Sequence, residues 1–407
     1  MTTSTSSRGA AKRALLSLAI GSFGIGMTEF VVMGLLPDIA QDLLPTAWGA
    51  SPDDAIAQAG WLITLYALGV VIGAPTIAGS VARFPRHRVM IGLALALTLF
   101  NALTFVLPTF ELVAASRLLA GLPHGAYFGI GALVAADVLG PGNRAKGVAF
   151  VLTGLTVANV VGVPLGTYLG QQVGWRAAFV LVAAIFALAT VFIGLFVPDH
   201  PGEPGRTLRA ELGVFRVGQV WATLAFGAIG FGGFFAVYSY VAPVVTEVAG
   251  SPEWAVPIIL VVMGIGMTIG NLIGGHLGDL DQRRTLLLGL TALAVVLALL
   301  ALTAQWIYAV AVFVFLTGLV SSALSPAIQT RLMDVAGDNQ SIAAALNHSA
   351  LNLGNSMGAF LGGLVITAGF GFAAPAWAGV ALALAGLAIA SVSLSLDRPK
   401  VAVAAPA

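Results

Sequence analysis

Glu29 is the residue whose type and position most directly indicate chemistry. It lies in the middle of an apolar stretch, Leu15 to Leu36, that is long enough to cross a lipid bilayer. No other acidic residue falls deep inside a predicted membrane-spanning segment. A carboxylate in hydrocarbon is costly, so a buried acid of this kind is by default a functional hypothesis. The most direct use of a titratable acid at this depth is to couple proton movement to transport.

Arg117 and His124 are basic residues of one predicted span, 110–138. Glu29 is seven residues from the end of its span near Leu36, or about 11 Å at about 1.5 Å per residue. Arg117 is seven residues from the start of an antiparallel span near Phe110, so the two lie at comparable depth. His124 follows Arg117 by almost two turns, on the same helix face, and imidazole titrates near neutrality. His124 could relay protons or bind substrate, or it could simply donate to a backbone carbonyl freed by Pro123.

Polar and aromatic residues in other spans are candidate substrate contacts. His348, Asn352 and Asn355 form a stripe at helical spacing, with Asn347 beside it, and Asn159 lies in an earlier span. The alternative for these residues is ordinary hydrogen bonding between helices in lipid. Aromatic side chains suit amphipathic, drug-sized ligands, and Phe235 and Tyr238 supply them, although aromatics near a span end can also form an interface belt.

The elements that position these residues are predicted to be membrane helices. Of the 407 residues, 58% are hydrophobic and only 9% are charged, against about 25% charged in a soluble domain. The apolar segments do not alternate with polar residues, which argues against a β-barrel. The sequence therefore predicts an all-α membrane protein with twelve transmembrane helices, at 13–36, 57–81, 87–107, 110–138, 145–168, 176–197, 217–246, 254–278, 285–303, 306–330, 340–368 and 373–396.

Charge is strongly asymmetric across the predicted membrane. With the N-terminus in the cytoplasm, 16 of the 18 basic residues lie on that side, and only Arg117 and Arg176 do not. The positive-inside rule then places both termini in the cytoplasm, which agrees with an even number of spans. These short basic loops are topology determinants rather than nucleic-acid sites. The chain has no cysteine, which excludes disulfides, thiol catalysis and cysteine metal sites.

Two halves of the chain are related by a direct repeat. Gly69, Gly73 and Arg86 recur 197 residues later as Gly266, Gly270 and Arg283, and Asn159 recurs at an offset of 196 as Asn355. A polar stretch separates the halves, which predicts domains at 1–197 and 217–407 joined by a cytoplasmic linker, 198–216. Six-span halves in the same orientation fit two bundles related by an axis along the membrane normal, with a substrate site near the midplane between them.

Four motifs make the chain similar to the major facilitator superfamily. They are the loop Ala82 to Arg88, the loop Gly278 to Arg284, the segment Arg117 to Gly125 and the segment Gly154 to Gly166. Together with Met27-Thr-Glu-Phe in the first span, they resemble the twelve-span drug:proton antiporters, and within these the arabinose-inducible efflux permease and chloramphenicol exporter branch. Ala82 stands where this family usually has an aspartate, and Val163 interrupts its glycine–proline signature.

The resemblance implies roles for several residues. Because the first and fourth spans of that fold line the cavity, we expect Glu29 and Arg117 to face each other directly or through water, as proton-coupling groups or as a static clamp. It also implies a gating bend in the fifth span. The residues expected to gate are Gly154, Gly162, Pro164 and Gly166, with Asp279, Arg283 and Arg284 as a charge latch or a solvated, topology-setting cluster.

The leading hypothesis is a proton-coupled exporter of a drug-like compound, sugar or metabolite in a bacterial inner membrane, working as a monomer without a cofactor. The alternative is a proton-coupled or facilitative importer on the same scaffold, because fold does not fix function. Ser349 beside His348 suggests an intramembrane hydrolase only weakly, since no catalytic triad is recognisable. ATP-driven export is disfavoured because the phosphate-binding glycine loop is absent, and a non-transporting receptor remains open.

Overall fold

The computed structural model describes residues 3–81, 83–139, 144–199, 216–336 and 340–396, and every regular element in these ranges is helical. Most of the predicted linker lies outside them, as does Ala82. The elements of the first half, here called the N-terminal bundle, are α1 (Thr3–Gly34), α2 (Leu36–Leu43), α3 (Pro45–Ala50), α4 (Pro52–Ala59), α5 (Trp61–Val81), α6 (Arg86–Val106), α7 (Phe110–Leu139), α8 (Arg144–Val157), the π-helix η1 (Ala158–Gly162), α9 (Val163–Val173) and α10 (Trp175–Phe196).

The second half, the C-terminal bundle, repeats this arrangement with fewer short helices. Its elements are α12 (Gly218–Tyr238), α13 (Val241–Pro243), the π-helix η3 (Val244–Val248), α14 (Ala255–Thr303), α15 (Ile307–Ala336), α16 (Gln340–Val365), the π-helix η5 (Ile366–Phe370) and α17 (Ala374–Ser395).

The predicted number of twelve spans is confirmed once α14 is counted as two. Within the described residues, 11 helical segments are long and apolar enough to cross a membrane. One of them is α14, whose 49 residues would extend about 73 Å as a single helix, more than twice the hydrocarbon thickness. Its backbone breaks at Asp281, where φ is −156° and ψ is 93°. The Asp281 carboxylate accepts from the Arg284 backbone N–H at 2.9 Å, which caps the helix that follows.

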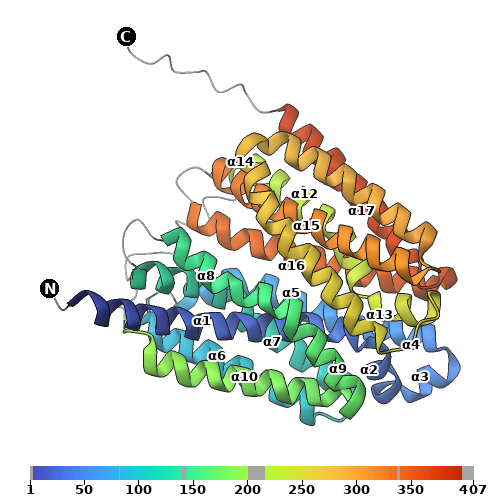
Figure 1. Cartoon of the computed structure of the whole chain (residues 1–407), viewed down its shortest axis with the longest axis horizontal. Helices are drawn as coiled ribbons and strands as arrows, with labels where there is room; N and C mark the ends of the chain where they lie inside the picture. Colours follow the sequence, from blue (N-terminus) through green and yellow to red (C-terminus); the bar gives the residue numbers. More distant parts are fainter. Residues whose placement is uncertain (1–2, 82, 140–143, 200–215, 337–339, 397–407) are drawn as a thin grey trace.

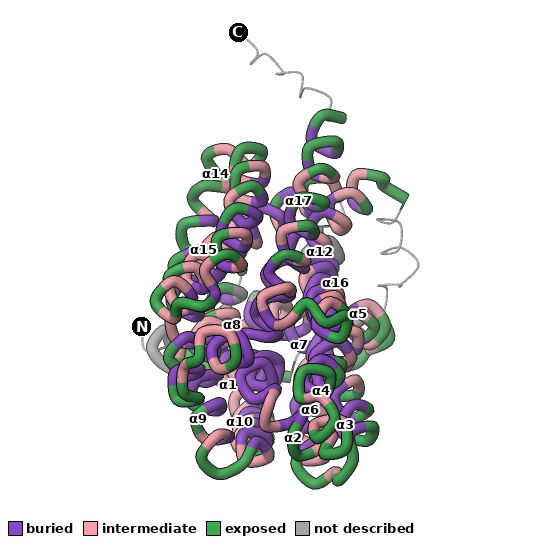
Figure 2. The backbone as a smooth tube through the Cα atoms, turned by 90° about the vertical axis from the view of Figure 1, so that its right-hand side faces the viewer, coloured by how far each residue is buried: buried purple, intermediate pink, exposed green. Residues whose placement is uncertain are grey.

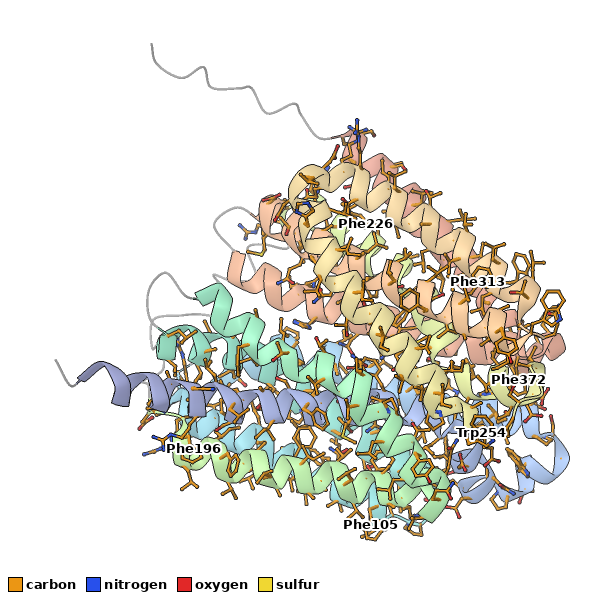
Figure 3. The ribbon with its side chains drawn as sticks, viewed as in Figure 1. Phe105, Phe196, Phe226, Trp254, Phe313 and Phe372 are labelled. Carbon is orange, nitrogen blue, oxygen red and sulfur yellow. The ribbon has the colours of Figure 1, made fainter. Side chains whose placement is uncertain are left out.

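The two bundles meet at one end and diverge at the other (Figure 1). We call the end that carries α2, α3, α4 and α13 the joined end, and the end where α1 begins and α17 finishes the divergent end. Trp254 marks the joined end and Phe196 the divergent end (Figure 3). At the joined end, the side chain of Gln171 donates to the backbone carbonyl of Glu253 at 3.1 Å, which links the bundles directly.

Burial separates inner helices from outer ones. In α1, 83% of the most apolar window is buried within the protein, against 28% in α10. In Figure 2, buried backbone gathers along α1, α7, α12 and α16, in the middle of the molecule. The polar side chains that are buried on these helices therefore face other helices rather than lipid.

Glycine contacts show the internal repeat in three dimensions. A Cβ atom on Gly69 would lie 2.2 Å from the backbone oxygen of Leu118, so α5 packs backbone to backbone on α7. A Cβ atom on Gly266 would lie 2.3 Å from the backbone oxygen of Phe315, which brings α14 equally close to α15. Small residues that allow such close approach are the usual basis of helix packing in membranes.

Candidate functional site

Glu29 faces the interior between the two bundles. Its side chain on α1 is 6% exposed, and its Oε1 accepts a hydrogen bond from Nδ2 of Asn355 at 3.1 Å. Asn355 lies on α16, so this buried bond joins the N-terminal bundle to the C-terminal bundle. A carboxylate turned outward toward acyl chains would have no such partner. The sequence did not predict this partner.

Arg117 forms no hydrogen bond or ion pair with Glu29 among the described residues; of the two expected forms of this pairing, direct or through water, the second stays a prediction. The guanidinium on α7 is completely buried and donates from Nη1 to Oγ1 of Thr28 at 2.8 Å and from Nη2 to the Thr28 backbone oxygen at 2.6 Å. It also lies 4.2 Å from the ring centroid of Tyr66, a cation–π contact. Thr28 donates in turn to Oδ1 of Asn101 at 2.5 Å. Arg117 therefore holds the residue next to Glu29.

His124 lies in a contact chain that crosses between the bundles. Its Nδ1 is 3.0 Å from the hydroxyl of Tyr66 on α5. Its ring packs edge-on against Phe128, with centroids 5.4 Å apart. Phe128 stacks on His348 of α16 at 5.1 Å with an interplanar angle of 7°. The sequence singled out both histidines, whereas Tyr66 and Phe128 carried no signal that distinguished them from core aromatics.

These contacts close a circuit around the middle of the molecule. It passes through four helices. Arg117, His124 and Phe128 lie on α7, and Tyr66 lies on α5. His348, Asn352 and Asn355 lie on α16, and Asn355 leads back to Glu29 on α1. We call this set the central ring: Glu29, Tyr66, Arg117, His124, Phe128, His348, Asn352 and Asn355. The ring contains an acid, a fixed cation, two imidazoles and two amides in a buried site, which are the groups needed to bind a polar ligand and to exchange a proton.

An aromatic cluster adjoins the central ring. Phe30, the next residue after Glu29, stacks on Tyr238 at 5.2 Å between centroids and on Phe235 at 6.5 Å. Phe30 belongs to α1, while the other two belong to α12 of the opposite bundle. Phe235 and Tyr238 are both buried, so they are not part of an exposed interface belt. Phe30 was missed because an apolar residue in an apolar span gives no functional signal.

The remaining predicted asparagines are buried as well. Asn159 lies in η1, where its Nδ2 donates to the backbone oxygen of Leu155 at 3.2 Å. Asn352 makes the same kind of bond to the backbone oxygen of His348 at 3.0 Å. Asn347 is 1% exposed. Of these three, Asn352 belongs to the central ring.

The predicted gating residues of the fifth span pack mainly on α1. Cβ atoms on Gly154, Gly162 and Gly166 would meet Ala19, Phe23 and Val31 of α1, respectively, at 2.1 to 3.0 Å. Pro164 follows the π-helix η1, consistent with its missing backbone donor and with the local widening seen at π-bulges. η1 also touches the other bundle, because a Cβ on Gly264 of α14 would lie 2.5 Å from the Asn159 backbone oxygen.

The charged residues at the divergent end form local pairs. Arg284 pairs with Asp281 at 3.2 Å, whereas Asp279 and Arg283 are exposed and show no ion pair with the described residues. In the N-terminal bundle, Arg86 forms an ion pair with Asp137 of α7. Sequence comparison of the two loops predicted that charge would matter here, but not that Asp137 would be the partner.

A second acidic site lies at the joined end. Burial, and then the nearby charge of Glu253 from the opposite bundle, raise the pKa of Asp38 from 3.8 to about 6. Asp42, one turn later on α2, forms an ion pair with Arg176. Burial alone would raise the pKa of Asp42, but the hydrogen bonds it accepts, led by that from Arg176, lower it below 3.8.

A separate cavity of about 670 Å³ lies between α12 and α17, lined mainly by apolar side chains with Gln219 and Ser393. None of the central ring residues lines it. We therefore do not assign the transported molecule to this cavity.

The fold and the buried polar site between two helical bundles define a multi-pass membrane transporter. A family model described as the Major Facilitator Superfamily matches residues 18–280 and 254–407. The inner membrane transport protein YdhP of Escherichia coli is 36% identical over 359 residues, covering 88% of this chain and 90% of YdhP. The putative transporter AraJ of Escherichia coli is 36% identical over 369 residues, covering 89% of this chain and 90% of AraJ.

A chloramphenicol resistance protein of Streptomyces lividans is 30% identical, over 89% of this chain and 92% of that protein. The crystal structure of a bacterial homologue of the lysosomal transporter Spinster, inward-facing and unoccupied, matches the fold with a TM-score of 0.70 at 16% identity, covering 97% of this chain and 99% of that one. The chain belongs to the Major Facilitator Superfamily and is a transporter of small molecules.

Proposed function

We propose that this protein exports a small molecule across a bacterial inner membrane in exchange for protons, as a monomer with both termini in the cytoplasm. The observation that carries the proposal is the buried bond from Asn355 to Glu29, which ties the two bundles together through an acid. The resistance named for the Streptomyces relative supports export over import. The basic residues at the divergent end support placing that end in the cytoplasm, so the arrangement described here is inward-facing.

The bond suggests how exchange is enforced. An antiporter must not reorient when it carries neither proton nor substrate. A hydrogen bond to an ionised carboxylate is stronger than one to a neutral group, so the empty, deprotonated carrier is held in place by Asn355. A proton on Glu29 weakens this bond, and a substrate that contacts either residue replaces it. Either event frees the bundles to rock about the central ring.

The test is uphill transport in everted membrane vesicles with an acidified lumen. Wild-type protein should accumulate substrate, and collapse of the pH gradient should stop accumulation. Glu29→Gln keeps an amide oxygen that can accept from Asn355 but removes the titration, so it should equilibrate substrate without concentrating it. Asn271→Leu, on an exposed position of α14, is the matched control and should behave as wild type.

Two results would redirect the proposal. Normal uphill export by Glu29→Gln would remove Glu29 from the coupling. Accumulation in right-side-out vesicles driven by an inward proton gradient, with none in everted vesicles, would instead favour a proton-coupled importer.

A further inference from the structure

The asparagines of the site share an unusual hydrogen-bond state. Asn159, Asn352 and Asn355 each use the side-chain NH₂ group on an atom that can only accept: a backbone oxygen for the first two, and the Glu29 carboxylate for the third. This fixes the orientation of each amide, because flipping it would place a carbonyl against another acceptor. The carbonyl oxygen of each is then left over, buried and without a hydrogen-bond partner among the described residues.

Two of these free acceptors lie on one face of α16. Asn352 and Asn355 are three residues apart, which separates them by about 5 Å along the helix axis. They are 5% and 0% exposed. Buried polar atoms are nearly always paired, and an unpaired one calls for an explanation. A pair of aligned, unpaired carbonyls next to a carboxylate is a surface built to receive hydrogen-bond donors.

The aromatic rings beside Glu29 define a second part of the proposed binding surface. Phe30 stacks on Tyr238 at the residue adjacent to Glu29, so an apolar, flat surface adjoins the acceptors. The Arg117 guanidinium donates to Thr28 and lies against the Tyr66 ring, while its Nε is buried without a hydrogen-bond partner among the described residues. The free carbonyl oxygens therefore specify donor groups on the ligand, and not its charge.

We infer that the transported molecule is a compound with a flat apolar part and at least two O–H or N–H donors about 5 Å apart, recognised by the carbonyl oxygens of Asn352 and Asn355. This rests on the proposed assignment of the central ring as the transport site and adds the class of substrate. It makes the donors of the substrate the groups that compete for Glu29 and Asn355.

The test is equilibrium binding to purified protein in lipid nanodiscs, without any pH gradient, so that it does not depend on proton coupling. The probes are matched pairs. Thiamphenicol and florfenicol differ by one hydroxyl replaced with fluorine, and phenyl β-D-glucoside is compared with its tetra-O-methyl ether.

We expect the donor-bearing neutral member of at least one pair to bind, and its capped partner to bind at least about 3-fold more weakly for each net hydrogen bond lost. Asn352→Leu should reduce the preference for the donor-bearing member, whereas Asn271→Leu should not. Because binding is measured without a pH gradient, failure of proton coupling and failure of this inference give different results.

Two outcomes would overturn the inference. One is equal affinity of capped and donor-bearing probes, which would mean that water alone satisfies the carbonyls. The other is no detectable binding of any donor-bearing probe up to about 1 mM, the upper end of the usual KM range of enzymes for small molecules.

Discussion

Replacing Asn355 with leucine tests the central mechanical claim, that this residue holds the bundles together through Glu29. Leucine is similar in size but cannot donate, so the Glu29 carboxylate loses its cross-bundle partner. A hydrogen bond to a charged group contributes about 1.5–3 kcal/mol net. Since about 1.4 kcal/mol corresponds to a factor of ten, the ratio of joined to separated bundles at the joined end should fall by about 10- to 150-fold.

The absence of cysteine makes this ratio measurable with spin labels on introduced cysteines. Gly49 of α3 has open space around its Cα, and Tyr308 at the start of α15 is 85% exposed, so both accept a label without disturbing the core. Both lie at the joined end, one on each bundle, because α14 leaves that end at Trp254 and returns to it before α15 begins. Electron–electron distance distributions in nanodiscs then report whether the joined end is open.

We expect one short distance in the parent protein and a substantial long-distance population in Asn355→Leu. Asn271→Leu, an equivalent change at an exposed position, should keep the parent distribution. A change of less than about 2-fold in the joined population of Asn355→Leu, with the protein folded and monodisperse, would refute the reasoning. It would mean that close packing at glycines, rather than the buried bond, sets the position of the bundles.

The remaining predictions concern packing and pH. Gly264→Val should abolish transport and open the joined end, because its Cβ would lie 2.5 Å from the Asn159 backbone oxygen; the same label pair and a transport assay check this. Because the pKa of Asp38 is raised from 3.8 to about 6, its protonated form stabilises the folded state. This stabilisation is fully present below pH 3.8 and is lost as the pH rises through about 6. The midpoint of thermal unfolding should therefore rise as pH falls from 7 to 4, and rise less in Asp38→Asn. The pKa of Asp42 is lowered below 3.8, so the stability that its ionised form contributes is lost only at a pH below this range.

Much of the fold could be predicted because lipid imposes strong rules on sequence. The lengths of the apolar segments predicted the spans. These include the two spans within α14, because 49 residues cannot cross one bilayer as a single straight helix. The short helices α2, α3 and α4 lie mainly between the first two predicted spans, 13–36 and 57–81, where no helix was predicted. Their sequences are short and polar, and prolines at 45 and 52 begin two of them, so hydropathy gives no signal for helix there.

The candidate site was predicted less completely. Residues that are rare in membranes were found, because a charge or amide in lipid is informative on its own: Glu29, Arg117, His124 and the asparagines are all buried, and His348 is partly buried. Phe30, Tyr66 and Phe128 were not, since aromatic residues are common in spans. Their roles depend on which face of the helix meets the other bundle, and an apolar span has no polar face from which to read that direction.

The direct hydrogen-bond partner of Arg117, which is Thr28 rather than Glu29, shows what depth reasoning does not determine. Equal depth in two antiparallel helices fixes position along the membrane normal, but successive residues on a helix are about 100° apart around its axis. Thr28 and Glu29 therefore differ little in depth and greatly in direction, and Arg117 contacts the first. The consequence is functional. Because Thr28 and Asn101 hold the cation within its own bundle, Glu29 is left to bond across the interface, where a change in its charge can alter how the two bundles meet.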